Sequence, residues 1–170
     1  MGIHSEHPFL PPEGERDPLR RFRGHLPSPV TIWTTGEGTA RSGLTVSSML
    51  VADGEPGRII GLIDEDSDLW ESLRESRTVV VNVVGVGRGQ FADAFAGVGP
   101  APGGPFQLAS WQQSAWGPVL DGHVGWLGAR LVEAEPRHVG WALLVEAVVE
   151  HVEVGDGDAL SHVRGRYRGH

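Results

Sequence analysis

The sequence predicts a mainly β protein, built as an antiparallel barrel with short peripheral helices. Apolar and β-branched runs that read as strands outnumber the helical segments by about two to one. The strands do not alternate regularly with helices, as they do in a doubly wound parallel sheet. Turns rich in Gly and Pro separate neighbouring strands, and they favour the hairpins from which a closed antiparallel sheet is made.

The expected elements follow in chain order. They begin with a short helix over Asp17 to Gly24 and strands at about 28–35, 43–52 and 57–64. The turn Asp53-Gly54-Glu55-Pro56-Gly57 joins the last two strands into a hairpin. Asp66 or Ser67 then caps a helix with Leu69, Trp70 and Leu73 on one face. The remaining expected elements are a buried strand over Thr78 to Val84, a short helix over Gln90 to Ala96, and long strands at about 118–134 and 138–154.

Composition excludes several kinds of chemistry. The chain has no Cys, so thiol nucleophiles, thiolate metal sites and disulfides are absent. All 14 Lys and Arg residues are Arg, which excludes a Walker phosphate loop and a Schiff-base lysine. The net charge of −8 argues against a nucleic-acid surface. No apolar run reaches the roughly 20 residues of a membrane span, so we expect a cytoplasmic protein that does not enter a membrane.

The 170 residues, 39% of them hydrophobic, fit one globular domain. We expect an extended, Pro-rich N-terminal arm over 1–18 and the barrel domain over 19–170.

Three tempting motifs fail on inspection. Gly85-Val86-Gly87-Arg88-Gly89 resembles a dinucleotide fingerprint, but Gln90 occupies its third glycine position. His151 and Glu153 supply two metal ligands on one strand face, where a closed site needs about four. Ser161 and His162 are adjacent on an extended chain and therefore point in opposite directions. We predict no metal site and no catalytic acid–base pair.

A cluster of hydroxyls marks the best candidate for a ligand site. Thr45, Ser47 and Ser48 lie in the segment Gly43 to Ser48, about one strand after Pro29 to Thr35. Buried hydroxyls are costly without hydrogen-bond partners, so these side chains are expected to contact either a ligand or the local backbone. In a strand Thr45 and Ser47 share a face, whereas Ser48 points across it.

These two segments, in this order, resemble the flavin reductase-like family. Further similar segments follow over most of the chain from Leu26 to Tyr167. They are Ile60 to Asp64 with Ser67, Val81-Asn82-Val83, Phe95-Ala96-Gly97, Gly117 to Leu120, and Arg164 to Tyr167. The resemblance implies a split β-barrel that binds FMN. The cofactor-binding residues it implies are Trp33, Thr34, Thr45, Val46, Ser47, Ser48, Asp64, Ser67 and Phe95.

The charges around this implied site differ from the family pattern. Arg41 or Arg88 would balance the FMN phosphate, whereas the loop from Asp64 to Asp68 carries acids that repel a phosphate. Relatives that use NAD(P)H carry Gly-Asp-His where this chain has Pro136-Arg137-His138, so His138 is the implied nicotinamide contact. Its imidazole would meet either the carboxamide or the pyrophosphate of the dinucleotide.

The resemblance implies hydride transfer from NADH or NADPH to bound FMN or free flavin. It also implies a homodimer and a possible partner monooxygenase. One alternative is an FMN-binding protein or electron carrier without nicotinamide turnover, which the altered Pro136-Arg137-His138 segment favours. The other is a structural barrel without a ligand, in which the hydroxyls at Thr45 to Ser48 bond only locally.

Overall fold

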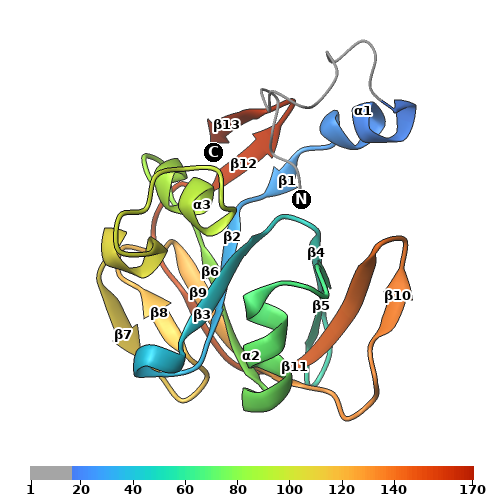
Figure 1. Ribbon diagram of the computed structural model, residues 1–170, viewed down its shortest axis with the longest axis vertical. Helices are drawn as coiled ribbons and strands as arrows, with labels where there is room; N and C mark the ends of the chain where they lie inside the picture. Colours follow the sequence, from blue (N-terminus) through green and yellow to red (C-terminus); the bar gives the residue numbers. More distant parts are fainter. Residues whose placement is uncertain (1–16) are drawn as a thin grey trace.

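The computed structural model describes residues 17–170, and its elements are labelled in Figure 1. The helices are α1 (Pro18–Gly24), α2 (Asp68–Ser76) and α3 (Gly89–Phe95), with the short 3-10 turns η2 (Gly38–Ala40) and η3 (Pro105–Leu108). The strands are β1 (Ser28–Pro29), β2 (Thr31–Thr35), β3 (Ser42–Val46), β4 (Met49–Ala52), β5 (Arg58–Ile63), β6 (Thr78–Val83), β7 (Trp111–Gln113), β8 (Pro118–Leu120), β9 (Gly125–Leu131), β10 (Arg137–Val139), β11 (Ala142–Val154), β12 (Leu160–Val163) and β13 (Arg166–Gly169). Of the arm expected over 1–18, only the last two positions fall within the described residues, where Asp17 caps α1.

One antiparallel sheet forms the body of the protein, in the strand order β3-β2-β6-β9-β11-β5-β4. β10 extends it by pairing with the first part of β11. β3 and β4 are the two ends of this order, yet only Ser47 and Ser48 separate them in the chain. The backbone N–H of Leu62 donates to the Ser48 carbonyl at 2.9 Å and extends the β4–β5 ladder up to this connection. The sheet therefore curls into a half-barrel (Figure 1), and the predicted antiparallel barrel with short helices is confirmed.

Two long predicted strands are each divided by a turn. The strand expected over 118–134 becomes β8 and β9, because Gly122 takes a left-handed φ of 79° between them. The strand expected over 138–154 becomes β10 and β11, which a two-residue turn at Gly140 and Trp141 connects. Each turn depends on a single glycine inside an otherwise strand-like run, a weak signal in the sequence.

Irregularities also interrupt two other expected strand patterns. The strand expected over 43–52 stops at Ser47 and resumes at Met49, because the chain leaves β2 there and begins to pair with β5. Within β11 the register against β9 shifts between Val149 and His151, which leaves Glu150 as an extra residue. The alternation expected along 148–153 is therefore broken.

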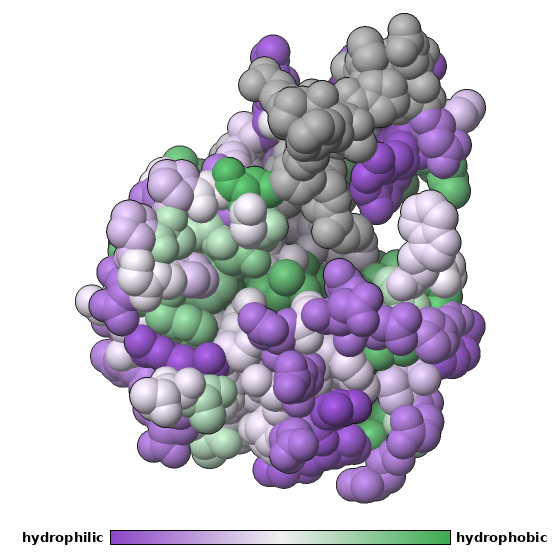
Figure 2. All heavy atoms as spheres, viewed as in Figure 1, coloured by the Kyte–Doolittle hydropathy of each residue, from purple (hydrophilic) through white to green (hydrophobic). Residues whose placement is uncertain are grey.

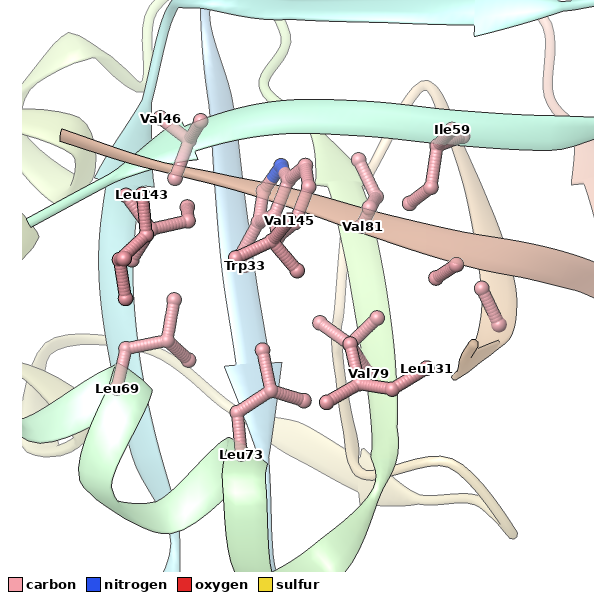
Figure 3. Close-up of a cluster of buried hydrophobic side chains, with 13 residues drawn as sticks. Trp33, Val46, Ile59, Leu69, Leu73, Val79, Val81, Leu131, Leu143 and Val145 are labelled. Atoms are coloured by element: carbon pink, nitrogen blue, oxygen red, sulfur yellow. The ribbon is translucent and has the colours of Figure 1, made fainter. Parts of the chain in front are cut away.

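α2 packs its apolar face into the curve of the sheet. Leu69 and Leu73 are buried and point from α2 toward Trp33 and Val145 (Figure 3), as the spacing predicted, and Trp70 is half-buried. The helix begins at Ser67, whose hydroxyl accepts from the Trp70 backbone N–H at 3.2 Å. The full core cluster is Trp33, Val46, Ile59, Ile63, Leu69, Leu73, Val79, Val81, Ala129, Leu131, Leu143, Val145 and Ala147. The outward face of α2 is polar, and hydrophilic residues cover this part of the surface in Figure 2.

A second cluster lies between the sheet and α3. Phe95 is buried there and meets Phe106 and Trp111 edge to face, with centroid distances of 5.0 and 5.6 Å. The C-terminal hairpin of β12 and β13 joins this side, because the Tyr167 hydroxyl donates to the Asp93 carboxylate on α3. Burial, reinforced by this hydrogen bond, raises the pKa of Tyr167 well above its ordinary value. The hairpin and α3 are thus held together by a hydroxyl that stays protonated.

A close approach of the backbone to a buried side chain predicts a sensitive position at Gly61. A Cβ atom there would lie 2.6 Å from the Trp33 ring, and the fully buried indole has no free space to enter. We expect Gly61→Ala to lower the free energy of unfolding by about 1–3 kcal/mol, the usual cost of overpacking. Urea unfolding followed by circular dichroism measures it. Gly24→Ala is the control, since nothing lies within 4 Å of its Cβ. Equal stability of the two variants would contradict the packing argument.

Candidate functional site

Ser47 and Ser48 form the corner at which the two ends of the sheet meet. Both residues are partly exposed, and within residues 17–170 neither hydroxyl has a hydrogen-bond partner. Thr45 differs, because its hydroxyl donates to the Ala92 carbonyl of α3 at 2.5 Å. Of the three clustered hydroxyls, the two at the corner are therefore free to bind a ligand.

The same rim of the half-barrel carries three other candidate residues. Ser48 is bonded to Leu62, and β5 ends one residue later, before the loop that contains Asp64 and Ser67. Ile63 lies opposite Leu143 of β11, which in turn lies opposite His138 of β10. Neighbouring strands lie about 4.8 Å apart, so His138 is roughly 10 Å from the end of β5. The structure thus brings together the corner, the 64–67 loop and His138.

The loop that follows β5 is fixed by its own side chains. The Asp64 carboxylate accepts from the Asp66 backbone N–H at 2.9 Å. The Ser67 hydroxyl donates to the Asp64 carbonyl at 2.7 Å while it caps α2. These two side chains shape the loop, so any ligand meets a rigid edge there.

His138 pairs with this loop across the rim. Its Nε2 lies 3.0 Å from a carboxylate oxygen of Glu65, a residue to which the sequence assigned no partner. The neighbouring Arg137 instead lines a cavity of about 160 Å³ between α2, the segment 132–136, β10 and β11. Trp70 of α2 and Arg77, which follows the helix, contribute to the walls of this cavity. Sequence reasoning missed Glu65 and the cavity because both depend on how β10 lies against the loop.

Three of the residues implied for FMN lie in the core instead. Trp33, Thr34 and Val46 are 0%, 0% and 3% exposed, so none presents a side chain to a ligand in this structure. The Thr34 hydroxyl donates to the Pro118 carbonyl at 2.6 Å and accepts from the Asn82 amide at 3.2 Å. β2 is buried on both faces because β3 and β6 flank it while the core and α3 cover it.

The α3 side of β3 carries the other residues implied for the flavin. Phe95 is buried and contacts Gly43, where a Cβ would lie 2.7 Å from its ring. The Arg41 guanidinium lies 4.5 Å from the centroid of the Phe106 ring. Arg88 donates to the Asp121 carbonyl at 3.2 Å. Within residues 17–170 neither arginine is paired with a carboxylate, so both cations are available to an anionic ligand.

These residues fit a phosphorylated, polar ligand such as FMN. The two corner hydroxyls are donors and acceptors without partners, which suits ribityl hydroxyls or a ring edge. Arg41 lies at the start of β3, at the opposite end of that strand from the corner, where its guanidinium packs on Phe106. The acids of the 64–68 loop argue for a phosphate position away from that loop, because like charges repel.

The described part of the chain holds neither a metal-binding cluster nor a membrane-spanning helix. Residues 17–170 hold no group of three His, Cys, Asp or Glu side chains arranged for a metal ion. They also form no helix that is long and apolar enough to cross a membrane.

Two curated proteins with similar sequences are named as reductases. The FMN reductase (NADH) RutF of Ancylobacter novellus is 27% identical over 157 residues, which cover 92% of this chain and 86% of that protein. The reductase component of 4-hydroxyphenylacetate 3-monooxygenase from Pseudomonas aeruginosa is 26% identical over 148 residues, with coverage of 85% and 87%.

Comparisons with solved structures and with family models point to the same group of proteins as the curated relatives. The NADH:FAD oxidoreductase of Streptomyces globisporus C-1027 has the same fold, with a TM-score of 0.79 at 23% identity over 94% of this chain and 95% of that one. The model of the flavin reductase like domain matches residues 23–170, nearly the whole of the described chain. The chain therefore belongs to the flavin reductase like domain family.

Proposed function

We propose that this protein is an NAD(P)H-dependent flavin reductase that holds FMN along the Ser47–Ser48 corner. The observation that carries the proposal is the pair of corner hydroxyls, which have no hydrogen-bond partner among residues 17–170 and lie on the rim that also carries His138. Family membership supports a reductase over an electron carrier without nicotinamide turnover or a barrel without ligand.

The protein's own part in this reaction is to bind and orient. A bound flavin supplies the hydride chemistry, so no acid–base pair of the protein is required. Ser47 and Ser48 donate hydrogen bonds from a corner that both ends of the sheet fix in place. Asp64 and Ser67 form the rigid edge beside it. His138 contacts the nicotinamide dinucleotide from the opposite side of that edge.

The corner hydroxyls provide the first test. We expect Ser47→Ala combined with Ser48→Ala to weaken FMN binding by about 1–3 kcal/mol, because donors to a buried polar ligand are lost. Fluorescence titration of FMN measures the affinity. Ser110→Ala is the control, since Ser110 is exposed and lies outside the site. Unchanged affinity in the double variant, or no FMN binding by the wild type at micromolar concentration, would refute the proposed site. FAD is titrated in parallel to decide between the two flavins.

Hydride donation provides the second test. We expect anaerobic stopped-flow mixing with NADH or NADPH to reduce the bound flavin. His138→Ala should raise the dinucleotide concentration needed for half-maximal rate and leave FMN affinity nearly unchanged, because only the donor contact is lost. His170→Ala is the control, since that exposed imidazole bonds to Ser161 in the C-terminal hairpin. No reduction by either dinucleotide would favour the electron carrier.

We also propose a homodimer. Among residues 17–170, β4 is an edge of the sheet with Leu50 and Val51 exposed at 68% and 61%, and Trp141 is fully exposed at the turn after β10. An uncharged apolar edge strand invites pairing with another chain unless it is covered. Light scattering should report a dimer at micromolar concentration, and Leu50→Asp should shift it toward monomer. A wild-type monomer with bound flavin would overturn this assembly.

Reduced flavin must pass to an acceptor, and we propose a partner monooxygenase. The Pseudomonas aeruginosa relative, named as a monooxygenase reductase component, supports this role. A cytoplasmic location, with no nucleic acid or membrane as partner, fits an enzyme that draws on dissolved nicotinamide dinucleotides.

A further inference from the structure

The contact between His138 and Glu65 joins two parts of the chain that are 73 residues apart. The imidazole Nε2 and the carboxylate oxygen lie 3.0 Å apart, while the side chains are 61% and 48% exposed. An exposed pair of this kind contributes little to folding stability. The pair matters instead because it orients the His138 imidazole and determines which ring nitrogen carries the proton.

Both partners are held on anchored backbone. His138 is paired in register with Leu143 across β10 and β11. Glu65 lies between Asp64 and Asp66, whose loop is closed by the bond from the Asp66 N–H to the Asp64 carboxylate. Because the backbone of both residues is held in place, the contact requires only rotation about side-chain bonds. Its cost in conformational entropy is therefore small.

No other charged group on β10 competes for His138. Successive side chains of a strand point to opposite faces, and Arg137 lines the cavity beside Trp70 on the far face from His138. Among residues 17–170, Glu65 is the carboxylate within ion-pair distance of this imidazole.

The chemistry of the pair fixes which ring nitrogen is free. A carboxylate only accepts hydrogen bonds, so contact with Glu65 requires the proton of a neutral imidazole to be on Nε2. Nδ1 then carries a lone pair and acts as an acceptor. A carboxamide has N–H donors that suit this acceptor, whereas a pyrophosphate offers only acceptors.

We propose that Glu65 is a positioning residue that holds His138 in the Nε2–H tautomer and presents Nδ1 to the carboxamide of the nicotinamide ring. This inference rests on the proposed reductase function for its ligand, but the tautomer is a property of the protein without ligand. Glu65 acts through His138 and touches neither the flavin nor the dinucleotide.

The first measurement needs no flavin. Long-range ¹H–¹⁵N spectra of ¹⁵N-labelled protein at about pH 8.5, above the ordinary imidazole range, report the tautomer of each histidine. His138→Ala identifies the signals of His138 by their loss. We expect the Nε2–H form to dominate in the wild type and in Glu65→Gln, whose amide oxygen still accepts, and a mixture in Glu65→Ala. Asp66→Ala is the matched control, because it removes a neighbouring exposed acid that does not contact His138. An equal fraction of the Nε2–H form in the wild type and Glu65→Ala would overturn the proposal.

The second measurement uses the flavin-loaded enzyme. We expect Glu65→Ala to raise KM for NADH about two- to five-fold, the range that an exposed ion pair allows, without changing kcat or FMN affinity. In the His138→Ala background the same substitution should have no further effect. Additive effects in the double variant would show that Glu65 does not act through His138.

A substrate analogue tests the carboxamide itself. The reduced acetylpyridine dinucleotide has a methyl group in place of the amide NH₂ and so lacks the donor. We expect the wild type to prefer NADH over this analogue, and both Glu65→Ala and His138→Ala to lose part of that preference. Equal preference in all three proteins would refute the assignment to the carboxamide. If the wild type oxidises neither dinucleotide, the proposed function fails with it, while the tautomer spectra still decide the role of Glu65.

Discussion

The closure of the sheet at Ser47 and Ser48 is the constraint on which the rest of the structure depends. Two consecutive strands lie at opposite ends of the strand order, so the chain can connect them only if the sheet curls. The bond from Leu62 to the Ser48 carbonyl carries the β4–β5 ladder up to that connection, so the sheet curls directly after β3 ends. The curled sheet encloses the space that α2 fills. The connection also places Ser47 and Ser48 between β3, which pairs with β2, and β4, which pairs with β5.

Hydroxyl density along the first strands was a mixed signal for a ligand site. Thr34 and Thr35 donate to the carbonyls of Pro118 and Thr78, both at 2.6 Å, and Thr45 donates to Ala92. A threonine hydroxyl in a buried strand offsets the cost of its burial by donating a hydrogen bond to a backbone carbonyl. This is the alternative to ligand binding that the sequence analysis left open. The serines differ because they lie between β3 and β4, where the chain leaves β2 and joins β5, and this depends on the sheet topology rather than on strand periodicity.

Local signals predicted well, and long-range ones did not. Ser67 caps α2 and its leucines enter the core because capping and helical spacing are both encoded within a few residues. The contact between Glu65 and His138 depends on how β10 and β5 are each paired with β11. That pairing joins residues far apart in the chain, so no short segment of the sequence encodes it. The burial of Trp33 likewise follows from β2 being flanked by β3 and β6, which the local sequence does not show, and its contact with a flavin stays a prediction.

Rigidity at the corner has causes on both faces of the sheet. On the inner face, α2 packs leucines beneath Trp33, and its capping serine orders the loop that carries Glu65. On the outer face, Thr45 bonds to α3, and α3 is bonded through Asp93 to Tyr167 of the C-terminal hairpin. A reductase whose redox chemistry belongs to a cofactor needs a fixed platform more than a reactive side chain. The corner hydroxyls lie between these two sets of contacts. Segments far from the corner in the chain therefore hold it in a fixed position.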